Sequence, residues 1–531
     1  MKKTGTDGGH PTRGRWSATA LAAMLMVACG GGGESVDDKS GNTATSLSAA
    51  GTSAKSSSAS CLNRVNNTFE KLLECVTLDG VRRHQQALQT IADAHNGIRT
   101  SGTPGYEASV AYAAQVLRDA GYLVTVTDFQ FQTFITLSAT VLEQVAPGPV
   151  GPLVNNIMEY SGSGDVTATV TALTPPPGDG TPGCEAADFA GFPAGNIALI
   201  SRGGCTFATK AANAQAAGAT GVVIYNNTAG DLNGTLGEAF SLNIGATGIT
   251  QALGQQLAAT PGLVLRLKTD TFRGQATTSN IIAESRTGDP NNVVMVGAHL
   301  DSVNEGPGIN DNGSGSAAIL ETAVQMAKVK PRNKLRFALW GAEEAGLVGS
   351  TNYVTGLSQA EKDRIALYLN FDMIGSPNHV FFVYDGDDSD ATGEGPGPGG
   401  SDQIEKAFEA FYTQRGVPFK GTDFDGRSDY RAFIQNMIPA GGLFTGAEGI
   451  KTAAEAASWG GTAGQPYDPC YHQACDTFTN NNDTALDINA DAVAYATLLF
   501  SMNTSTVNDQ RGKGNFRMPA LKPIQPPRAP N

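Results

Sequence analysis

"NVVMVGAHLD", residues 292–301, is a nearly unbroken apolar run that ends on a histidine and an aspartate. Such a run is typical of a strand buried on both faces of a parallel sheet. The segment after it, residues 313–330, carries apolar residues at helical spacing. Two more apolar runs, within 334–346 and 365–375, alternate with helix patterns in the same way. The alternation predicts an α/β fold with a mixed, mostly parallel sheet sandwiched by helices.

Ionisable residues follow each of these predicted strands. Ligands in open α/β sheets gather at the carboxyl ends of the strands, so we expect these side chains to share one rim. The group comprises His299, Asp301, Asp311, Glu343, Glu344 and Asp372. Buried carboxylates repel one another and lose hydration, and a divalent metal ion offsets both costs. Each residue alone has an ordinary explanation as a cap, a turn residue or a hydrogen-bonded core residue, but the combination predicts a metal centre.

The mixture of ligand types narrows the choice of metal. If the cysteines are paired in disulfides, no thiolate is available, and imidazole together with carboxylates favours zinc or a similar ion in a hydrolytic site. The number of ligand-type residues exceeds what one tetrahedral ion needs. Two ions about 3.5–4 Å apart that share a bridging carboxylate fit the set better.

A later stretch, "DPCYHQACDT" (468–477), places Tyr471 and His472 between Cys470 and Cys475. A loop that binds a metal loses conformational entropy, and a bridge between the two cysteines would close this loop in advance. Its effect on overall stability should be small, because short loops gain little from a cross-link. We therefore expect the bridge to position His472 as a ligand; the alternative is a surface disulfide with an incidental histidine.

Between about residues 135 and 275, Gly, Pro and Thr increase and short β-like runs dominate. The phrase "IALISRGGCTFATKAANAQAAGATGVVIYNN" (197–227) has a strand–helix–strand pattern and resembles the protease-associated domain, a small β-rich module inserted in secreted and vacuolar peptidases. The resemblance implies an internal bridge between Cys184 and Cys205. The segment before residue 135 fits the α/β fold, so the module is expected to interrupt that fold as an insertion.

The motifs "HLD", "NDNGSG", "GAEEAG", "NFDMIG" and "CYHQAC" together resemble the secreted two-zinc aminopeptidases of peptidase family M28, which include the bacterial leucyl aminopeptidases. The resemblance covers roughly residues 80–135 and 275–505 and implies the zinc exopeptidase fold. It also implies two Zn²⁺ per chain. Carried over by motif, one zinc would be held by His299 and Asp372, the other by Glu344 and His472, and Asp311 would bridge both.

The same resemblance assigns further roles. Glu343 would be the general base that takes a proton from a zinc-activated water, and Tyr471 would stabilise the developing oxyanion. Asp301 would orient the imidazole of His299. The peptide bond that follows the bridging Asp311 would be cis. Arg427, in "DGRSDY", is a candidate substrate contact, and large apolar N-terminal residues are the expected substrates.

Rival functions stay open at this stage. A carboxypeptidase of the same superfamily would use the same metal centre but needs a basic pocket for the substrate carboxylate. A glutaminyl cyclase is less favoured, because the complete two-zinc ligand set is present. From another class, the chain could be a non-catalytic protein that binds partners through its protease-associated domain.

Composition and the N-terminus favour an exported protein. The formal net charge of −14 argues against a nucleic-acid binder, which needs a basic face. Basic residues precede an apolar stretch, residues 16–28, that is too short to span a membrane and ends "LMVACGGGG". This resembles a bacterial lipoprotein signal with Cys29 as the lipidated residue; plain secretion is the alternative. The other six cysteines form three close sequence pairs, as expected for disulfides in an oxidising compartment, although sequence does not fix connectivity. We expect a monomer, secreted, periplasmic or anchored to the envelope.

These patterns define a domain plan. It comprises a signal peptide (1–29), a flexible linker (30–60), the first part of the peptidase domain (61–134), the protease-associated insertion (135–275), the catalytic domain (276–505) and a disordered tail (506–531), with Cys61 and Cys75 as the first disulfide pair.

Overall fold

The computed structural model describes residues 59–173, 180–391, 393 and 395–509. The predicted signal peptide with Cys29, the linker up to residue 58 and the tail from residue 510 lie outside the described residues. Two short helices change the predicted boundaries: α1 (Ala59–Asn63) begins inside the predicted linker, and α14 (Ser505–Asn508) occupies the start of the predicted tail. None of the helices in the described ranges is long and apolar enough to cross a membrane.

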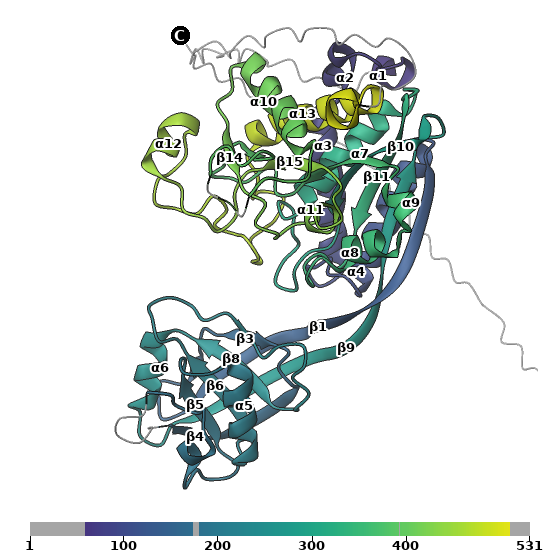
Figure 1. Ribbon diagram of the computed structural model, residues 1–531. Helices are drawn as coiled ribbons and strands as arrows, with labels where there is room; N and C mark the ends of the chain where they lie inside the picture. Colours follow the sequence, from purple (N-terminus) through teal and green to yellow (C-terminus); the bar gives the residue numbers. More distant parts are fainter. Residues whose placement is uncertain (1–58, 174–179, 392, 394, 510–531) are drawn as a thin grey trace, which may run out of the picture. The chain divides into compact units, whose positions relative to one another are not determined.

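A mixed sheet lies at the centre of what we call the α/β region, residues 59–134 and 276–509 (Figure 1). Its strands are β10 (Asp289–His299), β11 (Asn333–Trp340), β12 (Ile365–Phe371), β13 (Phe382–Tyr384), β14 (Lys420–Thr422) and β15 (Ala440–Phe444), with the C-terminal part of β9 (Val264–Glu284). The order is β14-β13-β15-β12-β10-β11-β9. The central strands are parallel, whereas β9 and β13 run antiparallel to their neighbours β11 and β15. This confirms the predicted mixed, mostly parallel sheet.

Helices cover both faces of this sheet. One face packs into a large apolar core with α2 (Phe69–Cys75), α3 (Leu78–Ala94), α4 (Pro104–Asp119), α7 (Gly313–Met326), α10 (Ser401–Arg415) and α13 (Asp483–Met502). The other face packs against α8 (Val348–Gly356) and α11 (Tyr430–Ile434). Two small helices, α9 (Gln359–Lys362) and α12 (Ala453–Trp459), complete the region. Burial on both faces explains why β10 and β12 read as continuous apolar runs.

The helix α7 begins unusually close to the sheet. Asn312 caps it by accepting a hydrogen bond from Gly315 N, and a side chain at position 315 would collide with the carbonyl oxygen of Phe371 at the end of β12. The small residues of "GSGS" (313–316) therefore let the helix start directly beside the strand ends. As a result, the residue before the cap, Asp311, lies at the rim of the sheet.

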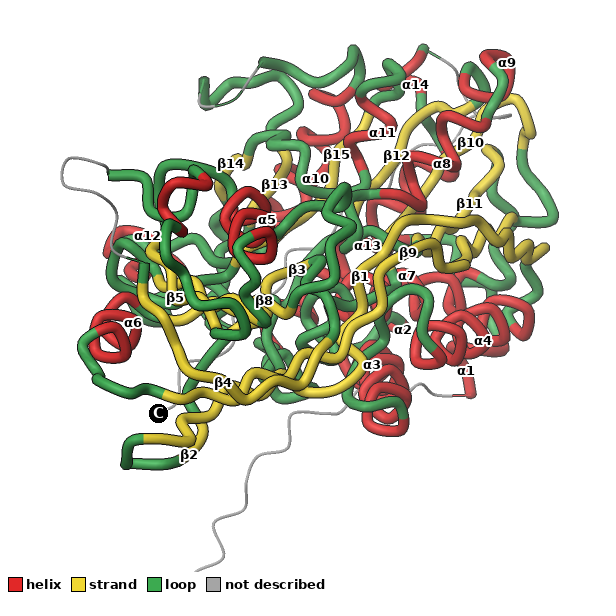
Figure 2. The backbone as a smooth tube through the Cα atoms, turned by 90° about the horizontal axis from the view of Figure 1, so that it is seen from below, coloured by secondary structure: helices red, strands yellow, loops and turns green. Residues whose placement is uncertain are grey.

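Two long antiparallel strands lead into and out of the inserted module, residues 135–275. They are β1 (Leu123–Ala146) and β9, and they pair from Leu123↔Glu284 to Ala146↔Val264 (Figure 2). Both predicted boundaries of the insertion fall inside this ladder. The other elements of the module are β2 (Gly151–Pro152), β3 (Asn156–Glu159), β4 (Gly164–Ala172), β5 (Ile197–Ser201), β6 (Gly221–Tyr225), β7 (Gly234–Thr235), β8 (Gly245–Ile249), α5 (Phe207–Ala216), α6 (Gln251–Ala258) and the 3-10 helix η1 (Ala186–Phe189). Its parallel strands β4, β5, β6 and β8 have one apolar core on each face.

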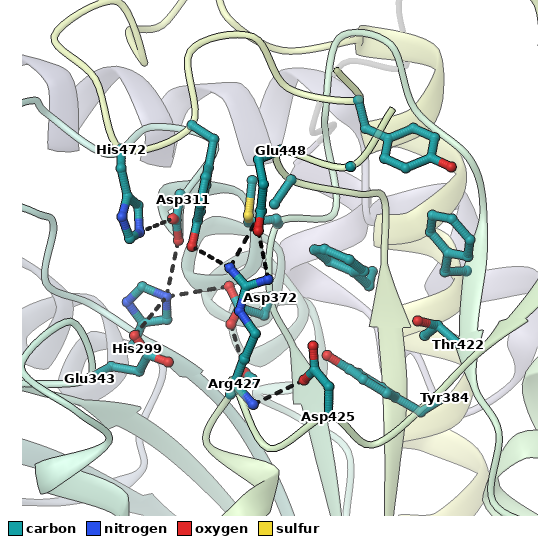
Figure 3. A pocket seen from close by; sticks show the side chains of 18 of the residues that line it. His299, Asp311, Glu343, Asp372, Tyr384, Thr422, Asp425, Arg427, Glu448 and His472 are labelled. Atoms are coloured by element: carbon teal, nitrogen blue, oxygen red, sulfur yellow. Dashed lines mark hydrogen bonds and ion pairs between the residues drawn. The ribbon is translucent and has the colours of Figure 1, made fainter. Parts of the chain in front are cut away.

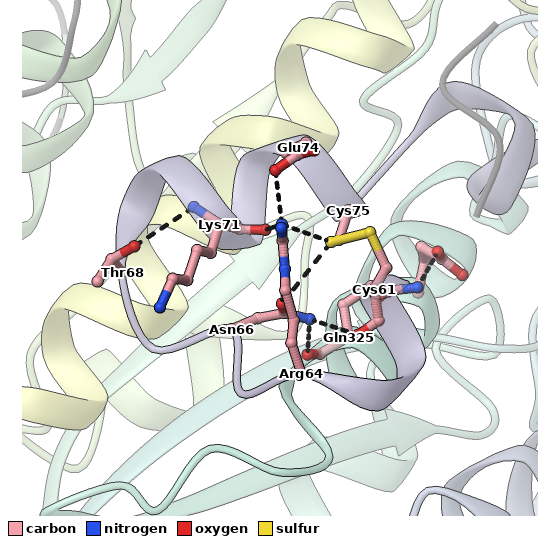
Figure 4. Close-up of a disulfide and its surroundings, with 9 residues drawn as sticks. Cys61, Arg64, Asn66, Thr68, Lys71, Glu74, Cys75 and Gln325 are labelled. Carbon is pink, nitrogen blue, oxygen red and sulfur yellow. Dashed lines mark hydrogen bonds and ion pairs between the residues drawn. A yellow bond between two sulfur atoms is a disulfide. The ribbon is translucent and has the colours of Figure 1, made fainter. Parts of the chain in front are cut away.

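Three disulfides join the six cysteines of the described chain in the pairs expected from their spacing: Cys61–Cys75, Cys184–Cys205 and Cys470–Cys475. The first pair ties α1 to α2 (Figure 4). Beside it, Asn66 Nδ2 donates to the carbonyl of Gln325 (2.9 Å), and Arg64 pairs with Glu74 (2.7 Å). These contacts anchor the first helices of the described chain on the C-terminal end of α7.

Candidate metal centre

His299 ends β10 and is 1 % exposed. Its Nε2 lies 3.2 Å from Asp311 Oδ1 and 3.3 Å from Asp372 Oδ1, the residue that follows β12. A strand end, the loop before α7 and a neighbouring strand end therefore meet at one nitrogen atom. Figure 3 shows the three side chains turned toward one another.

His472 makes a matching set of contacts from the disulfide loop. Its Nε2 lies 3.3 Å from Asp311 Oδ2 and 3.1 Å from Glu344 Oε2. The two carboxylate oxygens of Asp311 thus face one histidine each. Burial would raise the pKa of Asp311, but its contacts with the two imidazoles more than offset this and hold the pKa below its usual range. Asp311 therefore has the geometry and the charge of a carboxylate shared between two cations.

The spacing of the donor atoms fits zinc. A tetrahedral Zn²⁺ with ligands at about 2.0–2.1 Å has neighbouring donors about 3.3 Å apart. The four distances given above lie between 3.1 and 3.3 Å. His299, Asp311, Glu344, Asp372 and His472, the five residues predicted as ligands, are brought together as two groups that share Asp311. Imidazole and carboxylate donors without thiolate are also chemically suited to zinc.

The two adjacent glutamates occupy different positions. Glu344 Oε2 contacts His472, whereas Glu343 Oε2 stays 3.9 Å from His299 Nε2, outside the range of the other donors. Burial raises the pKa of Glu343 well above its usual range, and burial also raises the pKa of Glu344 to about 7 against the effect of His472. Glu343 is therefore a buried carboxylate next to His299, and ligand atoms of Glu343, His299 and Asp372 lie within 4.8 Å of one another.

Asp301, which we expect to orient the imidazole of His299, contacts that ring through its backbone and its side chain. His299 Nδ1 is 3.2 Å from the backbone carbonyl of Asp301 and 3.6 Å from its carboxylate Oδ1, which is longer than a hydrogen bond. The carboxylate accepts instead from the backbone N of Glu343 (3.3 Å). Asp301 thus connects the first histidine with the backbone of the glutamate pair.

Asp372 is held by a serine that the sequence does not single out. Ser428 Oγ donates to Asp372 Oδ2 (2.6 Å) and accepts from Asn370 Nδ2 (2.8 Å). This bond occupies the carboxylate oxygen that faces away from His299. The motif "DGRSDY" therefore contributes a positioning contact through its serine.

Two further acids that sequence reasoning missed flank the disulfide loop. Asp476, 2 % exposed, accepts from the backbone N of Asn310 (2.8 Å) and of Asp311 (2.9 Å). Asp468 accepts from Asn310 Nδ2 (2.7 Å) and shares Asn480 with Asp476. The loop that carries His472 is thereby fastened to the backbone of Asp311, whose bond to Asn312 is a cis peptide. The sequence signal that could have identified Asp468 and Asp476 is their position at the two ends of "DPCYHQACD".

A wholly buried arginine from the N-terminal segment was missed as well. Arg99 donates to the carbonyl groups of Leu300, Pro307 (2.8 Å) and Gly308 (2.6 Å). Burial lowers its pKa to about 10. It fixes the loop between the first histidine and Asp311, and a single buried Arg has no sequence signature.

Arg427 and Tyr471 lie on the open side of the ligands. Arg427 pairs with Glu448 through two contacts (2.8 and 3.3 Å), and its Nη2 donates to the Tyr471 hydroxyl (3.2 Å). The Tyr471 ring stacks on His472 with ring centres 3.9 Å apart. Both predicted residues therefore reach the centre, and they contact each other.

A cavity of about 260 Å³ opens onto these groups. All five predicted ligands, Glu343, Arg427 and Tyr471 line it. The remainder of its wall includes aromatic side chains from β13, β15 and the following loops. The arrangement can hold metal ions beside a pocket for part of an organic substrate.

Similar sequences and structures are known. The sequence pattern of peptidase family M28 matches residues 280–497, and that of the PA domain matches residues 166–257. An aminopeptidase of Pseudomonas aeruginosa is 50 % identical over 450 residues, which is 83 % of this chain and 84 % of that protein. The probable lipoprotein aminopeptidase LpqL of Mycobacterium tuberculosis is 43 % identical over 449 residues, 82 % and 87 % of the two chains. The structure is similar to that of a zinc aminopeptidase from Bacillus subtilis (26 % identity, TM-score 0.58, covering 79 % of this chain and 94 % of that one).

Proposed function

The chain belongs to peptidase family M28 and is a zinc-dependent aminopeptidase with an inserted PA domain. From this premise we propose that it removes N-terminal residues, large apolar ones among them. We propose that it does so with two zinc ions and with Glu343 as general base. The observation that carries the proposal is the position of Asp311, whose two oxygens each face a different histidine. A single ion would need only one of these oxygens.

The five ligand residues fit a pair of zinc ions. His299 and Asp372 would hold one ion, Glu344 and His472 the other, and Asp311 both. When bound, two zinc ions supply Lewis-acid polarisation of a water molecule and of the scissile carbonyl group. The remaining steps belong to side chains of this chain.

Glu343 is the proposed general base. Burial raises its pKa, and a carboxylate with a raised pKa accepts a proton more readily at neutral pH. It lies beside the ligands without contacting them at ligand distance. In this scheme Glu343 takes the proton from the attacking water and passes it to the nitrogen of the leaving amine.

Tyr471 is the proposed oxyanion donor. Its hydroxyl accepts from Arg427 Nη2, which leaves the hydroxyl proton available for another acceptor. A donor of this kind contributes about 2.7–4 kcal/mol to transition-state stabilisation in comparable sites. Arg427 acts in this scheme by orienting Tyr471 beside the substrate. Asp301 and Ser428 would hold His299 and Asp372 in place.

The substrate's free α-ammonium needs anionic partners, and Glu343 and Asp372, which both line the cavity, can supply them. Aromatic wall residues such as Phe382 and Phe444 suit an apolar side chain. The carboxypeptidase alternative is less favoured, because Arg427, the cation of this cavity, is already paired with Glu448.

Export is proposed on the disulfides and the N-terminal pattern. The three disulfides suit an oxidising compartment, and a relative bears the name of a lipoprotein. Cys29 is the proposed lipid-bearing residue, and the mature protein is proposed to act as a monomer on peptides with a free N-terminus.

Hydrolysis of matched peptides tests the proposal. Zinc-loaded protein should cleave a peptide that has a free N-terminus and an amidated C-terminus, and it should spare the same peptide with an acetylated N-terminus and a free C-terminus; zinc analysis should give two ions per chain. Cleavage of the N-acetylated peptide from its C-terminus would instead support a carboxypeptidase. Metal-free protein without any peptidase activity would support the binding-protein alternative.

A further inference from the structure

The two histidines of the metal centre differ in exposure. The side chain of His299 is 1 % exposed, whereas that of His472 is 41 % exposed. His299 ends a strand of the central sheet, but His472 lies on the loop 468–477 (Figure 3). One half of the ligand set therefore depends on a surface loop for its position.

This loop is fastened to the α/β region at its two ends. Asp468 and Asp476 hold the ends through the hydrogen bonds described above. Between them, the backbone hydrogen bonds that residues 470–475 make with other described residues all stay within 468–477. The segment that carries His472 is thus held in shape by its own turns and by the Cys470–Cys475 bridge.

The backbone of His472 has a conformation that is unfavourable for its residue type. Its φ is 54°, in the left-handed region. A residue with a β-carbon stays there only where the surrounding structure imposes it. In this segment the Cys470–Cys475 bridge is the one covalent constraint that closes the ring around His472. Opening the bridge would let the backbone relax, and the imidazole would leave its position 3.3 Å from Asp311 and 3.1 Å from Glu344.

The bridge is also the most accessible of the three disulfides. Thiol–disulfide exchange requires that a thiolate reach one of the two sulfur atoms. Cys475 is exposed. By contrast, both cysteines of Cys61–Cys75 are buried, and both of Cys184–Cys205 are partly buried. An external thiol would therefore react at Cys475 before it opens another bridge.

We propose that Cys475 is a site of thiol–disulfide exchange, and that opening of the Cys470–Cys475 bridge by an external dithiol removes His472 from the metal centre. One thiolate of the dithiol attacks the Cys475 sulfur, the S–S bond breaks, and Cys470 leaves as a thiolate that takes up a proton. The second thiolate of the dithiol then attacks the mixed disulfide, and Cys475 is released and protonated. The dithiol ends as a cyclic disulfide, so two electrons and two protons pass to the protein.

The effect is confined to one of the two metal positions. Without His472, the position beside Glu344 keeps only carboxylate ligands and loses its ion. His299 and Asp372 lie at strand ends and do not depend on the bridge, so the other position keeps its ion. The inference rests on the proposed two-zinc aminopeptidase function and adds a control of that site by the thiol state of the loop.

Reduction of the zinc-loaded enzyme with dithiothreitol tests the proposal. The thiols are then blocked with iodoacetamide, dithiothreitol is removed, and zinc is supplied again at the level that fills the oxidised enzyme. Peptide mapping should show Cys470 and Cys475 blocked before the other cysteines. The zinc content should fall from two ions per chain to one, and kcat/KM should fall about 10–100-fold. Enzyme that is reoxidised without blocking should regain both.

Two outcomes separate this inference from the proposed function. A blocked Cys470 and Cys475 pair with two zinc ions and unchanged kcat/KM would overturn the inference and leave the aminopeptidase function intact. An oxidised, zinc-loaded enzyme without aminopeptidase activity would count against the proposed function instead.

Variants locate the effect. Cys470→Ser/Cys475→Ser lacks both the bridge and the blocking groups, so it should hold one zinc ion before treatment and stay unchanged by dithiothreitol. The matched control, Cys184→Ser/Cys205→Ser, removes the bridge of the inserted module and should respond to dithiothreitol as the wild type does. If Cys470→Ser/Cys475→Ser holds two zinc ions and loses one on treatment, the sensitive group lies elsewhere in the chain and the proposal is wrong.

Discussion

The α/β region and the inserted module both place parallel strands between helices, but they differ at the carboxyl ends of those strands. In the module, β5 is followed by Arg202 and β6 by Asn226, and these two side chains contact each other (3.3 Å). Asn226 also donates to the carbonyl of Asp231 (2.9 Å). In the α/β region, by contrast, carboxylates gather at this edge of the sheet. Four carboxylate oxygens lie within 3.3 Å of the imidazole nitrogens of His299 and His472. The strand topology determines where a site can form. Whether a metal centre forms there depends on the side chains at the strand ends, because buried carboxylates need a cation to balance their charge.

The first way to sharpen this contrast is to remove the proposed base. Glu343→Gln should lower kcat by about 10²–10⁴, the usual contribution of a general base, because the amide cannot take up the proton. The zinc content should stay at the wild-type value, as measured by mass spectrometry of the dialysed protein. The matched control is Glu238→Gln, an exposed glutamate of the module, which should leave kcat unchanged. An active Glu343→Gln enzyme would remove Glu343 from the base role.

The second prediction concerns metal removal. Dialysis against dipicolinate should destabilise the α/β region by about 4 kcal/mol relative to protein in zinc at a thousand times its Kd. Hydrogen exchange should increase after β10, β11 and β12 and in the 468–477 loop, because their carboxylates lose the neutralising ions. Exchange in β5, β6 and β8 should stay the same. Equal loosening of both regions would contradict the difference drawn between them.

The third prediction compares one disulfide from each region. Replacing Cys470 and Cys475 by Ser should lower kcat/KM about 10–100-fold, because His472 and Tyr471 lose the ring that positions them. Replacing Cys184 and Cys205 by Ser should leave kcat/KM unchanged but lower the free energy of unfolding by about 3 kcal/mol, since this bridge closes a longer loop, with a sequence separation of 21 against 5. Peptidase assays and urea titrations of both double variants measure the two effects. If kcat/KM fell in the Cys184/Cys205 variant and not in the Cys470/Cys475 variant, the disulfide would not be needed to position His472.

The smallest effect is a pH dependence of stability. His379 is 8 % exposed, its Nδ1 has no partner among the described residues, and burial together with Lys451 lowers its pKa to about 4. Unfolded histidine titrates near pH 6.5, so between about pH 6.5 and 4 the unfolded chain binds a proton that the folded chain does not. The contribution of His379 to stability should therefore fall as the pH falls through this window, by about 2 kcal/mol between pH 7 and pH 5.

Urea titrations of wild type and of His379→Gln at both pH values check this prediction. The variant should show a flatter pH dependence than the wild type. The inserted module has no histidine at all, so hydrogen exchange at pH 5 should rise in the α/β region first. An equally steep pH dependence in His379→Gln would assign the effect to other groups.

The central fold could be predicted from sequence, and His299 and Asp372 could be placed at the rim of the sheet, because their signals are local. The apolar runs of β10 and β12 show burial on both faces, and each is followed directly by its ionisable residue. The role of Asp311 needed the resemblance to a known family, because position 311 has no strand before it. Asp476 and Arg99 were missed, since they act on backbone groups that lie 165 and about 200 positions away. Long-range contacts of this kind leave no periodic pattern.

The insertion boundaries show the same limit. The alternating pattern of "LVTVTDFQFQTF" (123–134) predicts a strand, but the length of that strand depends on pairing with a second strand about 140 residues further along the chain. Neither segment contains a sequence signal that identifies the strand with which it pairs.

The paired strands β1 and β9 have a consequence for how this architecture can arise. Because β1 and β9 already pair from Leu123↔Glu284 onward, before the chain enters the module, the two cut points of the interruption are neighbours in one ladder. A short hairpin turn joining the strands near Gln132 and Gln275 would restore a continuous chain. In evolution a module could thus be gained, exchanged or lost at this position as a single cassette, while the host sheet and its catalytic rim remain intact.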